Sequence, residues 1–258
     1  LTNTAISSLS DFMNRFSIQG LVLGLIYLLS LNAVHSADID EAEMTRLLKL
    51  RFPDINIDQV VLTPLNGVYQ TRLDGRYVYL LDGGRYIMVG DLIDLEDYRN
   101  ITENSRREDV VQELAAFSNQ ELIVYPAKKQ ELAVLNVFTD TSCGYCQQLH
   151  KEVKYLQEAG ISVRYFPFPR GGSRGPGYSD LRKVWCASDK LKAMDIAKRT
   201  APGALNAKPC AEGDMVDRGF ELGNRLGIQG TPSLFAANGT QFKGYVPYKR
   251  LIPQLLPQ

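Results

Sequence analysis

The pattern of apolar and polar positions predicts a short helix and then a series of strands between residues 37 and 97. Apolar residues recur at about helical spacing until Pro53 interrupts them, at Ala42, Met44, Leu47, Leu48 and Phe52. Three runs rich in β-branched and aromatic residues follow, at residues 68–71, 77–81 and 86–89. Asp74-Gly75 and residues 82–84 separate the runs with the turn sequences of tight hairpins. Because a unit of about sixty residues buries little core and leaves strand edges open, we expect it to associate with a second copy.

Residues 98–120 predict a helix that links two bodies. Ser105 and Glu108 have the spacing of a capping box. One apolar stripe follows the helix, at Val110, Val111, Leu114 and Phe117. The rest of the segment is polar, so we expect the helix to connect two units instead of lying inside one.

Strands and helices alternate in residues 121–258. A short apolar strand is predicted at 132–138, an amphipathic helix continues to residue 159, and Gly160 ends it before a strand at 161–166. A later helix over residues 213–226 and strands at 233–236 and 241–245 complete the pattern. The chain as a whole therefore predicts an α+β protein with a small N-terminal unit and a larger C-terminal one.

The run at residues 21–34 is almost wholly apolar and has the length of a signal-peptide core. It is too short to span a bilayer comfortably. Residues 1–36 are therefore predicted to be a signal peptide, with Met13 as a plausible start and cleavage after Ser36. An uncleaved membrane anchor is the alternative, and both place the rest of the chain outside the cytoplasm.

The charges balance, with 29 basic and 29 acidic residues, so the chain has no long-range attraction for nucleic acid. It has two histidines, His35 and His150, which excludes most multi-histidine metal sites. We expect no metal and no cofactor.

Cys143 and Cys146 lie at the junction between a predicted strand and a predicted helix. There the first cysteine meets unpaired backbone N–H groups and the positive end of the helix dipole. Both favour the thiolate, which is the form that attacks disulfides. We therefore predict that Cys143 is the nucleophile and that a buried Cys146 resolves the mixed disulfide.

Two alternatives remain for this pair. A structural zinc site would need a second close cysteine pair or spaced histidines. A purely structural bridge would close too small a ring to constrain the unfolded chain. Cys186 and Cys210 lie far apart in the sequence, and an even cysteine count in an exported chain favours a structural disulfide between them.

Motifs along the C-terminal part resemble the DsbC/DsbG family of bacterial periplasmic disulfide isomerases. They are residues 138–140 before Cys-Gly-Tyr-Cys, Leu149-His150, 163–165, 168–170, 185–187, Asp189-Lys190, 230–232 and Gly244-Tyr245. The sizes of the N-terminal unit and linker agree as well. The resemblance implies a dimerisation domain at 37–97, a helical linker at 98–120 and a thioredoxin-like catalytic domain with a helical insertion at 121–258.

The family implies a V-shaped homodimer that holds misfolded, disulfide-containing secreted proteins in an apolar cleft, in the periplasm. It implies a cis peptide bond between Thr231 and Pro232, and substrate binding at Gly144, Tyr145, Thr231 and Pro232. It also implies a membrane reductase of the DsbD type as partner. Gln147-Gln148 and the glycine-rich loop at 171–177 depart from the family pattern.

Two further residues near the cysteines are expected to be structural. His150 lies four residues after Cys146, and a surface or partly buried position is favoured over a role in tuning the thiols. Asp140 is expected to cap the turn that follows it, with a buried proton acceptor as the alternative.

We predict a protein disulfide isomerase or reductase that attacks non-native disulfides through a reduced Cys143–Cys146 pair. A DsbA-like oxidant is the first alternative, and the reduction potential of the pair would separate the two. A chaperone or binding module with incidental cysteines is the second.

Overall fold

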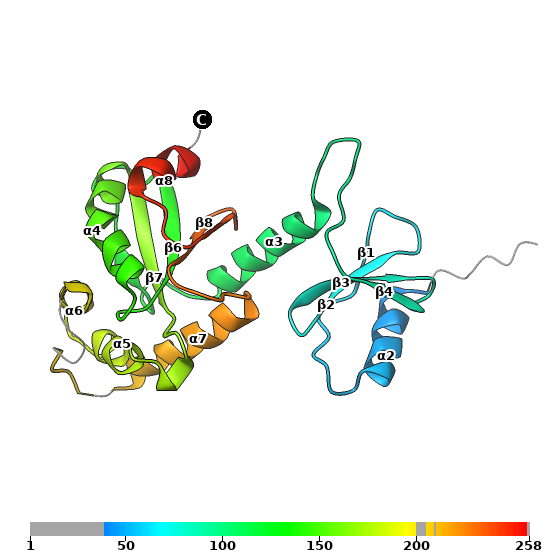
Figure 1. The fold of residues 1–258 in the computed structure, drawn as a ribbon, viewed down its shortest axis with the longest axis horizontal. Helices are drawn as coiled ribbons and strands as arrows, with labels where there is room; N and C mark the ends of the chain where they lie inside the picture. Colours follow the sequence, from blue (N-terminus) through cyan, green and yellow to red (C-terminus); the bar gives the residue numbers. More distant parts are fainter. Residues whose placement is uncertain (1–38, 200–204, 209, 257–258) are drawn as a thin grey trace, which may run out of the picture. The chain divides into compact units, whose positions relative to one another are not determined.

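A computed structural model describes residues 39–199, 205–208 and 210–256 (Figure 1). Contacts within the chain divide it into two compact units, with the boundary between Val89 and Gly90, and each unit is described by itself. The predicted signal peptide at 1–36 lies outside the described residues. Every described helix is too short or too polar to cross a membrane.

The first unit is a helix packed on a four-stranded antiparallel meander. Helix α2 (Glu41–Arg51) begins at Asp40, whose carboxylate accepts the Glu43 backbone N–H at 2.7 Å. The strands follow in the order β1 (Val61–Leu62), β2 (Tyr69–Leu73), β3 (Arg76–Leu81) and β4 (Tyr86–Met88). Its core is small and contains Met44, Leu48, Val60, Tyr69 and Leu80. The helix and the hairpins lie close to where the hydrophobic pattern predicts them.

The turn between β2 and β3 has two residues, Asp74 and Gly75, with φ of 48° and 77°. Two successive positive φ values are those of a type I′ turn, which matches the twist of paired strands. The Asp-Gly pair therefore sets the register of this hairpin.

The second unit contains a five-stranded sheet in the order β5-β7-β6-β8-β9. The central strands β6 (Ala133–Thr139) and β7 (Ile161–Pro167) are parallel, and the other pairs are antiparallel. The outer strands are β5 (Ile123–Tyr125), β8 (Ser233–Ala236) and β9 (Gln241–Lys243). Its longer helices are α3 (Ile101–Ala115), α4 (Gly144–Glu158), α5 (Tyr178–Trp185), α6 (Lys190–Arg199), α7 (Met215–Arg225) and α8 (Tyr248–Leu255).

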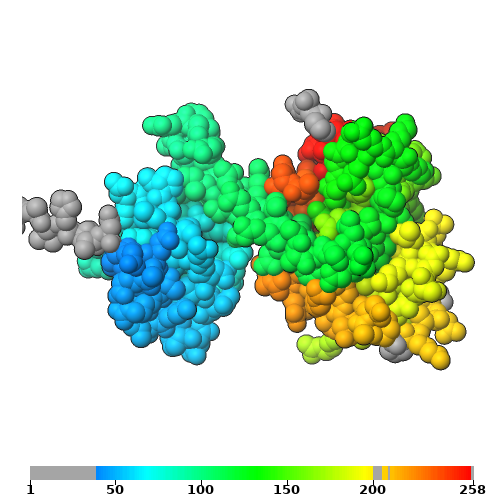
Figure 2. Space-filling model, turned by 180° about the vertical axis from the view of Figure 1, so that it is seen from behind, coloured from blue at the N-terminus to red at the C-terminus, as the bar shows by residue number. Residues whose placement is uncertain are grey.

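The crossover from β6 to β7 runs through α4, which packs on β7, while α8 packs on β6. Between β7 and β8 the chain inserts α5, α6 and α7, with short 3-10 turns η1 (Gly172–Arg174) and η2 (Ala211–Asp214). In Figure 2 this insertion, coloured yellow to orange, forms one side of the second unit and lies beside the green part of the same unit. Parallel strands joined by a helix, with antiparallel outer strands, form the thioredoxin-like part of this α+β chain.

Helix α3 differs from its prediction in where it starts and in what it contacts. It begins at Ile101, because Asn100 accepts the Glu103 backbone N–H at 2.8 Å, so Ser105 is inside the helix. Its apolar stripe continues into the core of the second unit through Val110, Leu114 and Phe117. The domain boundaries at residues 97 and 120 stay a proposal.

Candidate active site

The cysteine pair lies where β6 ends and α4 begins. Cys143 is the N-cap residue of α4, and its backbone N–H donates to the Asp140 carbonyl at 3.2 Å. Both cysteines are buried, and neither is in a disulfide. A Cβ added at Gly144 would meet no atom within 4 Å, so the first turn of the helix is open on the side of this residue.

The turn before Cys143 is held by the buried carboxylate of Asp140. This carboxylate accepts the backbone N–H and the hydroxyl of Ser142, both at 2.8 Å. It also accepts the backbone N–H and Nε of Arg170, at 2.9 and 3.2 Å. Asp140 thus makes the turn-capping contacts expected from the sequence, and it holds Arg170 beside the cysteines.

The surroundings of Cys143 favour its thiolate. A hydrogen bond from the Cys146 thiol is the largest cause that lowers the pKa of Cys143 to about 5. Burial acts in the opposite direction, while the Cys146 backbone N–H and the charge of Arg170 add to the lowering. A thiol with this pKa is ionised at neutral pH, whereas a free cysteine thiol has a pKa of about 8.5.

Cys146 is in the opposite state. Burial raises the pKa of its thiol well above the ordinary value, and the hydrogen bond to Cys143 adds to the increase. The positive charge of Lys198 lowers it in part. The two cysteines therefore differ in protonation, with one sulfur prepared to attack and the other kept as a thiol.

The loop before β8 brings Thr231 to the cysteine pair. The Sγ of Cys143 lies 3.2 Å from the Thr231 carbonyl oxygen, to which the thiol form donates. The peptide bond between Thr231 and Pro232 is cis. Residues that are 88 apart in the sequence are thus in direct contact.

Tyr145, between the two cysteines, is 64% exposed and stacks on Tyr245 with ring centroids 6.1 Å apart. The Tyr245 hydroxyl donates to Glu152 at 2.6 Å, which fixes the second ring. An exposed aromatic pair beside the nucleophile offers an apolar surface to an incoming chain.

His150 is buried, so the expected surface or partly buried position is wrong. Its Nε2 donates to the Asp195 carboxylate at 2.9 Å, and its Nδ1 accepts the Tyr165 hydroxyl at 3.0 Å. Burial is the main cause that lowers the pKa of His150 to about 4, so the imidazole is neutral at physiological pH. The Tyr125 hydroxyl also donates to Asp195, at 2.8 Å. Tyr125, Asp195, His150 and Tyr165 therefore form one hydrogen-bonded network.

Lys198 is the residue beside the site that the sequence did not indicate. It lies on α6, in a stretch with alternating basic residues typical of a solvated helix. The structure buries it instead, with its Nζ 2.8 Å from the Asp140 carbonyl oxygen.

Family models and relatives match most of the chain. Residues 118–256 match the thioredoxin-like domain model, and residues 35–103 match the N-terminal domain model of disulfide bond isomerase proteins. Thiol:disulfide interchange protein DsbC of Escherichia coli K12 is 34% identical over 191 residues, which are 73% of this chain and 76% of the relative. The chain belongs to the DsbC family. The DsbC of Dickeya dadantii is 31% identical over 236 residues, 91% of this chain and 93% of the relative.

Membership of the DsbC family makes the chain a thiol–disulfide oxidoreductase with a thioredoxin-like domain. Within the described residues, no group of three histidine, cysteine or acidic side chains is arranged to hold a metal ion.

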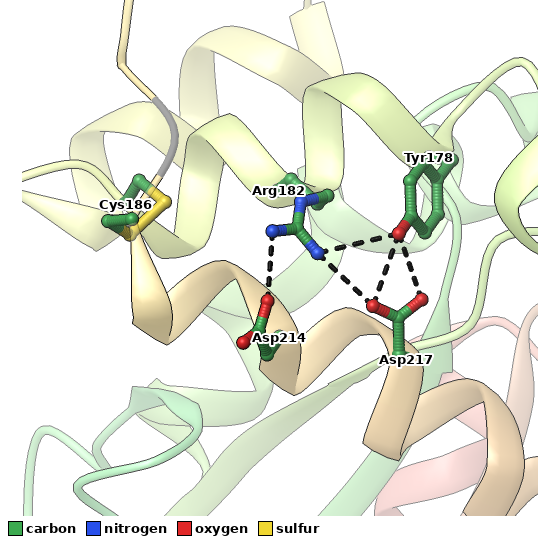
Figure 3. Close-up of a disulfide and its surroundings, with 6 residues drawn as sticks. Tyr178, Arg182, Cys186, Asp214 and Asp217 are labelled. Carbon is green, nitrogen blue, oxygen red and sulfur yellow. Dashed lines mark hydrogen bonds and ion pairs between the residues drawn. A yellow bond between two sulfur atoms is a disulfide. The ribbon is translucent and has the colours of Figure 1, made fainter.

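In this DsbC-family chain a disulfide joins Cys186, at the end of α5, to Cys210, just before η2. Beside it, Arg182 donates to Asp214 at 2.9 Å and to Asp217 at 3.1 Å, and the Tyr178 hydroxyl donates to Asp217 (Figure 3). These polar contacts are partly exposed and contribute little each. The disulfide is the covalent link between the two segments, in addition to the packing of α5 against η2 and α7.

Proposed function

We propose that this chain is a periplasmic protein disulfide isomerase and reductase that works through Cys143 and Cys146. The observation that carries the proposal is the opposite perturbation of the two thiols, with the pKa of Cys143 lowered and that of Cys146 raised. A binding module with incidental cysteines has no need of such a pair.

The proposed reaction begins when the Cys143 thiolate attacks one sulfur of a wrong disulfide. A bond forms between Cys143 and that sulfur, the substrate disulfide breaks, and the second substrate sulfur leaves as a thiolate. Another substrate thiolate can then attack the mixed disulfide, which forms a new substrate disulfide and frees Cys143. If none does, Cys146 attacks Cys143 and releases the substrate reduced.

Substrate chains are proposed to bind across Gly144, Tyr145, Thr231 and Pro232. The Thr231 carbonyl oxygen lies 3.2 Å from the Cys143 sulfur, and the exposed Tyr145 adds an apolar contact. After a reductive cycle Cys143 and Cys146 are joined, so the proposal includes a membrane reductase of the DsbD type that returns them to thiols.

A homodimer is proposed to form through the N-terminal unit. Strand β4 ends its sheet, and its residues are all exposed, including Tyr86, Ile87 and Met88. Val89, which follows, is exposed as well. An apolar edge strand with free backbone groups is suited to pairing with a second copy.

Scrambled ribonuclease in glutathione buffer, with molecular mass measured in parallel, tests both parts of this proposal. The native chain should restore ribonuclease activity and have the mass of a dimer. Ile87→Lys places a charge on the β4 edge and should give a monomer that still reduces insulin but restores ribonuclease poorly, because it no longer encloses the substrate.

Leu50→Lys is the matched control, since Leu50 is an exposed apolar residue of the same unit on α2. It should remain dimeric and active. A native chain that is monomeric and fully active would keep the chemistry and refute the dimer. A chain that oxidises reduced ribonuclease but does not restore the scrambled form would be an oxidant.

A further inference from the structure

Lys198 is 1% exposed, although lysine is rarely buried without an acidic partner. Its Nζ donates to the Thr139 hydroxyl at 2.6 Å and to the Asp140 carbonyl oxygen at 2.8 Å. Both acceptors are neutral. Among the described residues, no carboxylate forms an ion pair with this ammonium group. A buried charge held in this way is costly unless a negative charge forms nearby.

The position of Nζ connects it to the cysteine pair. The Asp140 carbonyl that it contacts also accepts the Cys143 backbone N–H, at 3.2 Å. Helices α4 and α6, which carry Cys146 and Lys198, pack against each other. Burial lowers the pKa of Lys198, and the charge of Cys146 is the largest influence that raises it.

The nearest carboxylate is committed elsewhere. Asp140 directs both of its oxygens to Ser142 and Arg170. The lysine contacts the Asp140 backbone carbonyl, and the Asp140 charge acts on it without an ion pair. Among the residues described, no cationic side chain donates a hydrogen bond to the thiol of Cys146, and the charge of Lys198 lowers the pKa of that thiol.

Other titratable groups face the lysine from each surrounding element. They are Tyr165 of β7, His150 of α4 and Arg170 after β7, while Asp195 and Arg199 of α6 act on His150. The Tyr165 ring centroid is 6.0 Å from Nζ, and burial raises the pKa of its hydroxyl well above the usual value. His150 is neutral, and Asp195 is held by His150 and Tyr125. The His150 imidazole and the Tyr165 hydroxyl therefore keep their protonation states between pH 6 and 9, and neither would imitate a change at Cys146.

We propose that Lys198 is a positioning residue for the release step, in which its ammonium group stabilises the Cys146 thiolate as Cys146 frees a trapped substrate. The inference rests on the proposed function and deepens it. A more readily formed Cys146 thiolate favours reductive release over rearrangement within the substrate.

Cys146 loses its proton to solvent, and its thiolate attacks the Cys143 sulfur of the mixed disulfide. The Cys143–Cys146 bond forms, the bond between Cys143 and the substrate sulfur breaks, and the substrate leaves as a thiolate. The negative charge is on Cys146 before the attack, which is where the lysine acts.

The reaction of the reduced full-length chain with the aromatic disulfide reagent dithionitrobenzoate separates the two cysteines. The first thionitrobenzoate is released when Cys143 attacks the reagent, and the second when Cys146 displaces it from Cys143. Stopped-flow absorbance records both releases over a range of pH. Lys198→Met is the test variant, since methionine fills a buried site without a charge.

Lys192→Met is the matched control, because Lys192 is an exposed lysine on the same helix. In Lys198→Met the rate of the first release should change by less than about threefold. The rate of the second release should fall by about tenfold at neutral pH. The pH profile of that rate should move to higher pH, because the Cys146 thiolate loses a nearby positive charge. The control should match the native chain in both phases.

A second release that is unchanged or faster in Lys198→Met, with a normal first release, would refute the role of Lys198 and leave the proposed function intact. A first release no faster than that of free cysteine would refute the proposed function itself. If Lys198→Met fails to fold, Thr139→Val removes one anchor of Nζ and keeps the charge. It should slow the second release less than threefold, and a larger slowing without a shift of the pH profile would count against an electrostatic role.

Discussion

Replacing Cys143 with alanine is expected to lower the rate of ribonuclease recovery by at least about a thousandfold, since the reaction loses its nucleophile. The pKa of this thiol is lowered to about 5, so it supplies the thiolate at neutral pH. Cys146 cannot substitute for it, because burial keeps its thiol protonated. The measurement is the initial rate of activity recovery from scrambled ribonuclease.

Cys146→Ala provides the comparison. It keeps the attacking cysteine, whose pKa rises because the hydrogen bond from the Cys146 thiol is lost. It cannot release a substrate that fails to rearrange, so mass spectrometry should detect chain and substrate joined at Cys143. Part of the isomerase activity should remain. Equal losses in the two single variants, or activity that survives the double replacement, would contradict the assigned roles.

Removing the disulfide between Cys186 and Cys210 is expected to lower the free energy of unfolding by about 3.5 kcal/mol, because the bridge closes a loop whose ends are 24 residues apart. The variant is Cys186→Ala with Cys210→Ala, and urea unfolding followed by circular dichroism measures the change. Arg182 and its two aspartates should not compensate, because they are partly exposed.

The native chain with its disulfide reduced is the control, and it should lose a similar amount of stability. Replacing Cys186 alone should add misoxidised species, because it leaves Cys210 free to pair with Cys143. A loss below about 1 kcal/mol in the double variant would mean that the packing of α5 against η2 holds this region without the bridge.

The elements that local sequence dictates were predicted well. The meander of the first unit follows from Asp74-Gly75 and the alternating strands, since the turn residues set the register. The junction at Cys143 follows from a strand that leads directly into a helix. The start of α3 was placed too late, because Asn100 caps the helix before Ser105 can.

The rest depended on contacts between distant segments. Lys198 lies in a basic stretch whose local pattern indicates solvent exposure, and it is buried because α6 packs against α4. His150 is buried because Asp195 and Tyr165 satisfy both ring nitrogens, and neither partner is adjacent in the sequence. The contact between Cys143 and Thr231 came from the family resemblance, since spacing alone cannot bring them together.

A lowered pKa at Cys143 also makes the stability of the reduced protein depend on pH. The folded state holds the thiolate more strongly than the unfolded chain, so the gain is complete above the unfolded pKa of about 8.5. It is lost as the pH falls through about 5. The ionised thiol therefore stabilises the reduced form over the physiological range.

The pH dependence of iodoacetamide labelling at Cys143, with the modified residue identified by mass spectrometry, tests the central claim most directly. The account predicts a labelling rate that reaches half its plateau near pH 5. A midpoint near the value of a free thiol, about 8.5, would show that the surroundings of Cys143 do not hold it as a thiolate.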